Sequence, residues 1–115
     1  MNHAEARTIA LALPGAEEAD HGGKPSFRVN GKIFVIIQAD GRTLTVKTTK
    51  EERALLASAE PQTYGVPEGF AHLSYMHIQL KTAEDEQVRN LIEAAWGLVA
   101  PKKTVKAYFC GGANA

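Results

Sequence analysis

The fold is decided by residues 26–47, which read SFRVNGKIFVIIQADGRTLTVK. Three runs in this stretch, 26–29, 32–37 and 43–47, are rich in the β-branched and aromatic residues that favour strands. Asn30-Gly31 separates the first two runs and Asp40-Gly41 the last two, and both dipeptides suit the positive φ angles of two-residue hairpin turns. The stretch therefore predicts a three-stranded antiparallel meander.

The two turns also predict the register of this meander. Phe27 should lie opposite Phe34 and Arg28 opposite Ile33 around the first turn, and Ile37 should meet Leu44, and Val35 meet Val46, around the second. One face would then collect Ile33, Val35, Ile37, Leu44 and Val46. The other would collect Phe27, Val29, Phe34 and Ile36. The central strand would be apolar on both sides, so we expect cover on both faces, from a helix or from a second subunit.

Helical spacing and breaker residues predict the elements around the meander. A first helix should occupy residues 2–13, and a second should follow Thr49 and end before Pro61. Residues 73–81 alternate as a strand does, and a long helix should run from about residue 83 until Pro101 interrupts it, with one further helical segment over 102–109. The apolar stripe of the long helix is Val88, Leu91, Ile92, Ala95, Trp96 and Val99, which makes Trp96 a predicted core residue. The predicted fold class is therefore α+β, in the order α-β-β-β-α-β-α-α, with an antiparallel sheet covered by helices.

Length and composition predict one domain. The chain has 115 residues, 44% of them hydrophobic, which is enough for one core without disulfides or a metal. We expect a single domain over residues 1–109 and a flexible tail over 110–115. Cys110 is the only cysteine, so no internal disulfide can form. With no signal-peptide pattern and no apolar run of membrane-spanning length, the sequence predicts a cytoplasmic protein that does not enter a membrane.

The net charge is zero, but the charges are unevenly distributed. Residues 24–50 hold six lysines and arginines against one acid, a net charge of +5, and three further lysines lie near the C-terminus. Such an arrangement can place a basic face on a neutral protein, although scattered charges that keep a protein soluble produce the same pattern.

Several stretches resemble the MmcQ/YjbR family in order and spacing. They are Leu13 to Glu18, His21 to Phe34, Leu44 to Lys47 and Ala95 to Lys103. The resemblance spans roughly residues 9 to 108 and implies a CyaY-like fold and DNA binding. Residues 72–78 depart from the family pattern, because the Asn-Lys and Trp common there are replaced.

DNA binding would use cations that strands and turns hold at fixed spacing, so that they meet phosphates without reading bases. The candidate contact residues are Lys24, Arg28, Lys32, Arg42, Lys47, Lys102 and Lys103. Two alternatives stay open. The chain could be a protein-interaction module or homodimer that uses the face formed by Phe27, Val29, Phe34 and Ile36, or it could have a small-ligand or enzyme role near His21.

The sequence predicts no catalytic residues, no cofactor and no metal site. His72 and His77 are an odd number of residues apart on the predicted strand and would project to opposite faces. Ser26 lies in neither a nucleophile elbow nor a phosphate loop, and Cys110 has no activating partner nearby in the sequence. We therefore expect a protein that is not an enzyme.

Overall fold

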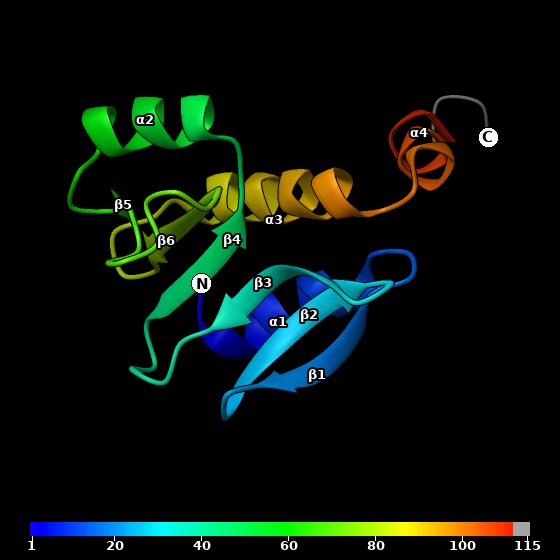
Figure 1. The fold of residues 1–115 in the computed structure, drawn as a ribbon, viewed down its shortest axis with the longest axis horizontal. Coiled ribbons are helices and arrows are strands. Elements are labelled where there is room, and N and C mark those ends of the chain that lie inside the picture. Colours follow the sequence, from blue (N-terminus) through cyan, green and yellow to red (C-terminus); the bar gives the residue numbers. More distant parts are fainter. Residues whose placement is uncertain (112–115) are drawn as a thin grey trace.

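The structure is a computed structural model that describes residues 1–111 of the chain. Its elements follow one another as α1 (His3–Ala12), β1 (Glu17–His21), β2 (Lys24–Val29), β3 (Lys32–Ile37), β4 (Thr43–Lys47), α2 (Lys50–Ala59), β5 (Tyr64–Gly65), β6 (Tyr75–Gln79), α3 (Asp85–Val99) and α4 (Lys102–Gly111). The strands form one antiparallel sheet in the order β1-β2-β3-β4-β6-β5 (Figure 1). The predicted α+β class and element order are confirmed, and β1 and β5 are added to them.

The core lies between the sheet and two helices, α1 and α3. Helix α1 begins at the capping box of Asn2 and Glu5, which satisfies backbone N–H groups of its first turn. It buries Ala6, Ile9 and Ala10. Helix α3 buries the whole predicted stripe, Val88, Leu91, Ile92, Ala95, Trp96 and Val99, and packs against β2, β3, β4 and α1. No helix among residues 1–111 is long and apolar enough to span a bilayer.

The predicted register of the first hairpin is wrong beyond the turn. Arg28 pairs with Ile33 as expected, and Asn30 and Gly31 both have positive φ. A β-bulge then shifts the ladder, so that Phe27 pairs with Val35 instead of Phe34. The extra residue, Phe34, lets two consecutive residues of β3, Phe34 and Val35, both bury their side chains in the core.

The bulge removes the predicted second apolar face. Phe27 and Phe34 are fully buried and Val29 is 3% exposed, all three in the same core as Val35. Only Ile36 lies on the other side of the sheet, where it pairs with Ser26 and Thr45. A partner or second subunit therefore cannot dock on the predicted set of four residues.

The second hairpin has the predicted register. Ile37 pairs with Leu44 and Val35 with Val46. Asp40 holds the turn, because its carboxylate accepts hydrogen bonds from the backbone N–H groups of Arg42 and Thr43, both at 2.9 Å, and from the Thr43 hydroxyl. These bonds lower the pKa of Asp40 from its usual 3.8 to about 2, with the Thr43 hydroxyl as the largest cause.

Asp40→Asn should lower stability at neutral pH by less than about 1 kcal/mol, because water screens this exposed carboxylate. Since the folded pKa lies below the unfolded value, the stabilisation is present above about pH 4 and is lost as pH falls towards about 2. Urea unfolding at several pH values should show the two proteins converging in acid. Glu68→Gln in an exposed loop is the control, and a difference that does not shrink in acid would contradict this role.

The chain departs from the predicted boundaries near its end. Helix α4 continues through Cys110 to Gly111, two residues past the end of the helical segment predicted over 102–109. Residues 112–115 of the predicted tail lie outside the described residues.

Candidate nucleic-acid interface

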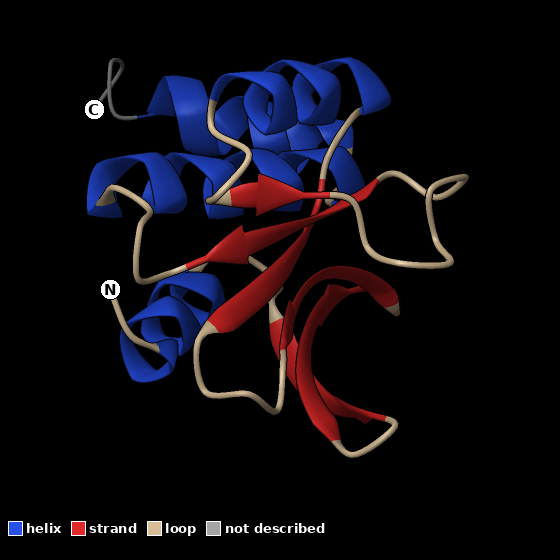
Figure 2. Cartoon of the chain, turned by 90° about the vertical axis from the view of Figure 1, so that its left-hand side faces the viewer, coloured by secondary structure: helices blue, strands red, loops and turns tan. Residues whose placement is uncertain are grey.

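One face of the sheet points away from α1 and α3 and is concave, and no helix of residues 1–111 covers it (Figure 2). Antiparallel partners project their side chains to the same face, so the pairings identify its residues. Ser26 pairs with Ile36, Ile36 with Thr45, and Thr45 with His77, which gives one row across four strands. Alternation along the strands adds three cations to this surface, which we call the open face: Lys24, Arg28 and Lys47.

One end of the open face carries two cations next to Tyr75. The Lys47 ammonium nitrogen lies 5.0 Å from the centroid of the Tyr75 ring, within the range of a cation–π interaction. The Tyr75 hydroxyl donates to the carbonyl of Ile33, the strand partner of Arg28, at 3.3 Å. Burial raises the pKa of Tyr75, and the charge of Arg28 opposes this shift. Arg28 is itself held by bonds from Nε to Ser26 Oγ at 3.0 Å and from Nη2 to a backbone carbonyl of β1 at 3.2 Å. Both charges are therefore fixed in position.

The other end of the open face is built around Lys24. Its ammonium donates to Gln38 Oε1 at 2.8 Å, and Gln38 Nε2 donates to Thr45 Oγ1 at 2.7 Å. The half-buried His77 lies beside these groups; burial lowers its pKa, Lys24 adds to the lowering and Asp40 opposes it. A surface cavity of about 350 Å³ opens here, lined by Lys24, Gln38, Ala39, Asp40, Thr43, His77 and Gln79.

The other predicted cations do not lie on the open face. Lys32 pairs with Val29, whose side chain is in the core, so Lys32 belongs to the opposite side at the edge of a turn. Arg42 lies in the β3–β4 turn, 3.9 Å from an acid of the same turn. Lys102 and Lys103 begin α4, which packs on the end of α3 through aromatic contacts. The structure thus brings together Lys24, Arg28 and Lys47 from the predicted set.

The polar residues of β6 on the open face were missed by sequence reasoning. Residues 73–81 alternate between apolar and polar side chains, and the apolar Met76 and Ile78 are fully buried. The same alternation turns Tyr75 and His77 outward, and this was the available signal. Their neighbours could not be inferred, because a helix and a long loop separate β6 from β4, its partner in the sheet.

The argument that placed His72 and His77 on opposite faces of one strand is wrong, because β6 begins only at Tyr75 and His72 lies in the preceding loop. Within residues 1–111, no three His, Cys, Asp or Glu side chains are grouped so that they could hold a metal ion.

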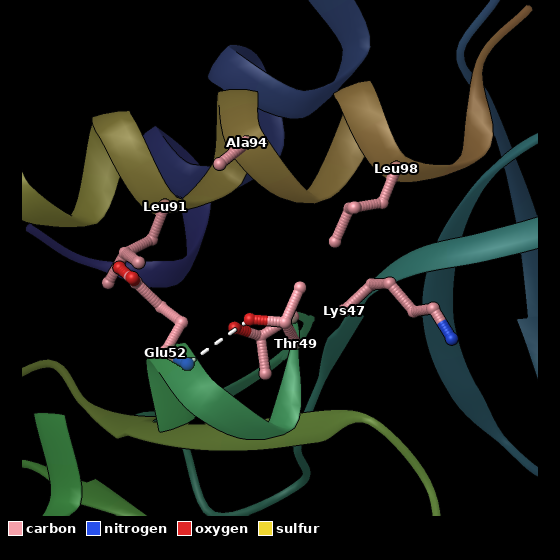
Figure 3. A pocket seen from close by; sticks show the side chains of 7 residues that line it. Lys47, Thr49, Glu52, Leu91, Ala94 and Leu98 are labelled. Carbon is pink, nitrogen blue, oxygen red and sulfur yellow. Dashed lines mark hydrogen bonds between the residues drawn. The ribbon is translucent and has the colours of Figure 1, made fainter. Parts of the chain in front are cut away.

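A second cavity, of about 230 Å³, lies between the start of α2 and α3 (Figure 3). Its helical wall is formed by Leu91, Ala94 and Leu98. Thr49 caps α2 by accepting a hydrogen bond from the Glu52 N–H at 3.1 Å. The stem of Lys47 lines this cavity, whereas its ammonium points away from the other labelled side chains. The aliphatic stem of Lys47 therefore lies against the α2–α3 side, while its ammonium is directed to the open face.

Comparisons with known proteins agree with this fold. The YjbR family model matches residues 11–98. Among solved structures, the chain is similar to the crystal structure of Deinococcus radiodurans protein DR2400, which has the family-model domain DUF419. The TM-score is 0.76 with 20% sequence identity, over 87% of this chain and 79% of the other. No curated protein matches the chain.

Proposed function

From the premise that this chain belongs to the YjbR family, we propose that it is a cytoplasmic DNA-binding protein and not an enzyme. It contacts the phosphates of duplex DNA through Lys24, Arg28 and Lys47. The observation that carries the proposal is that strand pairing places these three cations on one face, which is concave and free of helices, in a chain with no net charge. The ion pairs within residues 1–111 engage the N-terminal amine, Arg7 and Arg42 instead.

The chemistry of the open face favours backbone contacts over base reading. Phosphate contacts supply most of the non-specific affinity of a protein for DNA, and a concave surface suits a convex rod. Glu17 of β1, the strand partner of Arg28, borders the face on its outer strand. Its carboxylate repels phosphates and so confines the contact to β2, β3 and β4.

Binding should be micromolar or weaker, insensitive to sequence and lost steeply with salt. For three phosphate contacts, the logarithm of the association constant should fall against the logarithm of salt concentration with a slope of about −3. Each change of Lys24, Arg28 or Lys47 to Ala should make the slope shallower by about one unit. Fluorescence anisotropy of a labelled duplex over a salt series measures both quantities.

Reversing two charges on the open face, with Arg28→Glu and Lys47→Glu together, should abolish binding. The matched control is the pair Arg89→Glu and Lys106→Glu, which makes the same change in net charge on α3 and α4. This control should retain most of the affinity, because its residues belong to the helical layer. Equal losses in both double variants would show that only net charge matters, and absence of duplex binding by the unmodified protein at low salt would refute the proposal.

A further inference from the structure

The cavity at the Lys24 end of the open face has the features of a binding pocket for a small ligand. Its volume of about 350 Å³ falls within the usual range for such sites, about 300 to 1,000 Å³. A cation, an imidazole and two side-chain amides converge on it from β2, β6 and the connection between β3 and β4, contributed by Lys24, His77, Gln79 and Gln38. The proposed DNA contacts use Lys24 alone among these groups.

Lys24 is the group in this cavity that can attract an anion. An ammonium has three N–H donors, and the bond in the structure goes to a neutral acceptor, Gln38 Oε1, at 2.8 Å. The lysine is half-buried, where its charge interacts more strongly than on an open surface. The cavity therefore presents a positioned cation whose hydrogen-bond partner is an amide.

Asp40 also lines the cavity, but its carboxylate is hydrogen-bonded within the β3–β4 turn. Its two oxygens accept the bonds from Arg42 and Thr43 described above, and the Arg42 guanidinium lies 3.9 Å from Oδ2. A carboxylate bonded in this way stays ionised and turned towards its donors. Asp40 therefore weakens the attraction of the cavity for an anion without occupying the space beside Lys24.

We propose that this cavity is an oxyanion pocket, in which Lys24 binds a sulfate-like, phosphate or carboxylate group and His77 contributes a second donor when it gains a proton. The charged groups around His77 are Lys24 on β2 and Asp40 in the turn, with His21 opposite Lys24 on β1. Burial makes protonation of His77 less favourable than it is in water. A bound anion favours the imidazolium, so anion binding and protonation of His77 strengthen each other.

Inorganic sulfate is the suitable probe, because its charge stays constant between about pH 5 and 8, where an imidazole titrates. In spectra of isotope-labelled protein, sulfate should cause saturable shifts of the side-chain amides of Gln38 and Gln79. The pKa of His77 should rise in saturating sulfate, whereas the side-chain signals of His72, in an exposed loop, should not respond to sulfate. If the two amides do not respond to sulfate in a saturable way, the pocket does not exist.

Variants separate the roles of the two residues. Lys24→Met should raise the dissociation constant for sulfate by about tenfold or more, while Lys32→Met, the same change outside the cavity, should leave it unchanged. His77→Gln keeps a hydrogen-bonding side chain and should bind sulfate equally well at low and high pH, unlike the unmodified protein. Equal effects of the two Lys→Met changes, or an unchanged pH dependence in His77→Gln, would overturn the assignment.

The pocket could receive its oxyanion from a free small molecule or from the DNA backbone, and competition distinguishes the two. If sulfate displaces duplex more effectively than chloride at equal ionic strength, the pocket seats a backbone phosphate. If it does not, the pocket serves a separate ligand. The Arg28→Glu and Lys47→Glu double variant should bind sulfate with unchanged affinity. Failure of the DNA proposal can therefore be distinguished from failure of the pocket proposal.

Discussion

Trp96→Ala should lower the free energy of unfolding by about 3 to 5 kcal/mol, the range for emptying a buried aromatic site. The indole is fully buried, and its Nε1 donates to the Pro14 carbonyl at 2.8 Å. Its ring also lies edge-on to Tyr108, at 4.9 Å between centroids, and to Phe109, at 6.0 Å. One side chain therefore joins the end of α1, helix α3 and helix α4, and its removal loosens all three.

Two further variants separate the parts of this effect. Trp96→Phe keeps most of the apolar volume but leaves the Pro14 carbonyl unpaired, so it should cost about 1 to 3 kcal/mol. Leu98→Ala, on the same helix at a side chain that is 49% exposed, should cost much less than Trp96→Ala. Urea unfolding with a check on the m-value measures all three. A loss below about 1 kcal/mol for Trp96→Ala would mean that the indole is not part of the core.

The two predicted turns show where local sequence is enough to predict strand register and where it is not. Around Asp40-Gly41 the predicted register holds, because strand pairing continues without interruption from Ile37 and Leu44 outward, although only Gly41 of the dipeptide has the expected positive φ. Around Asn30-Gly31 the turn is right but the ladder shifts by one residue. The sequence could not predict this shift, because residues 33–37 of β3 are all apolar. An uninterrupted apolar strand gives no alternation that could reveal a bulge, and a one-residue shift exchanges faces.

Strand β1 was not predicted for a different reason. Strand β1 consists of residues Glu17–His21, all exposed, and its sequence has little preference for a strand. It forms because β2 offers an edge to the segment that follows α1, as its pairing from Glu17 with Arg28 to His21 with Lys24 shows. Tertiary context therefore overrides local preference here.

The candidate site was partly predictable for the same reasons. A charge count along the chain included Lys24, Arg28 and Lys47 among the candidates, but it could not separate them from Lys32, Arg42, Lys102 and Lys103, which lie elsewhere. Tyr75, His77 and Gln79 join the first three only through the pairing of β4 with β6. The cavity between Lys24 and His77 depends on that non-local pairing, and local sequence patterns do not specify it.

Arg53→Met should have the other large effect, a loss of about 2 to 4 kcal/mol. Arg53 is the buried residue of α2, 7% exposed. Its guanidinium donates to three backbone carbonyls, those of Ala71 and Leu73 at 2.7 Å and of Tyr75 at 3.0 Å. Methionine fills a similar volume without any donor, so it leaves these acceptors unpaired, each at a cost of about 1 to 3 kcal/mol unless water reaches it.

The position of the three carbonyls makes the expected result more specific than a loss of stability. They belong to the loop before β6 and to the first residue of that strand, so Arg53 ties the loop to α2 and fixes the start of the strand that carries Tyr75 and His77. Hydrogen exchange should therefore accelerate first in residues 66–75 of Arg53→Met, before the core strands respond.

Arg53→Lys should lose less stability than Arg53→Met, because an ammonium keeps donors but not the fork that reaches three acceptors. Lys50→Met, an exposed position at the start of the same helix, should change stability by no more than about 0.5 kcal/mol. If exchange rises uniformly across the sheet, or if Arg53→Met is as stable as Lys50→Met, the guanidinium does not anchor the loop and the geometry of the open face rests on the strand pairing alone.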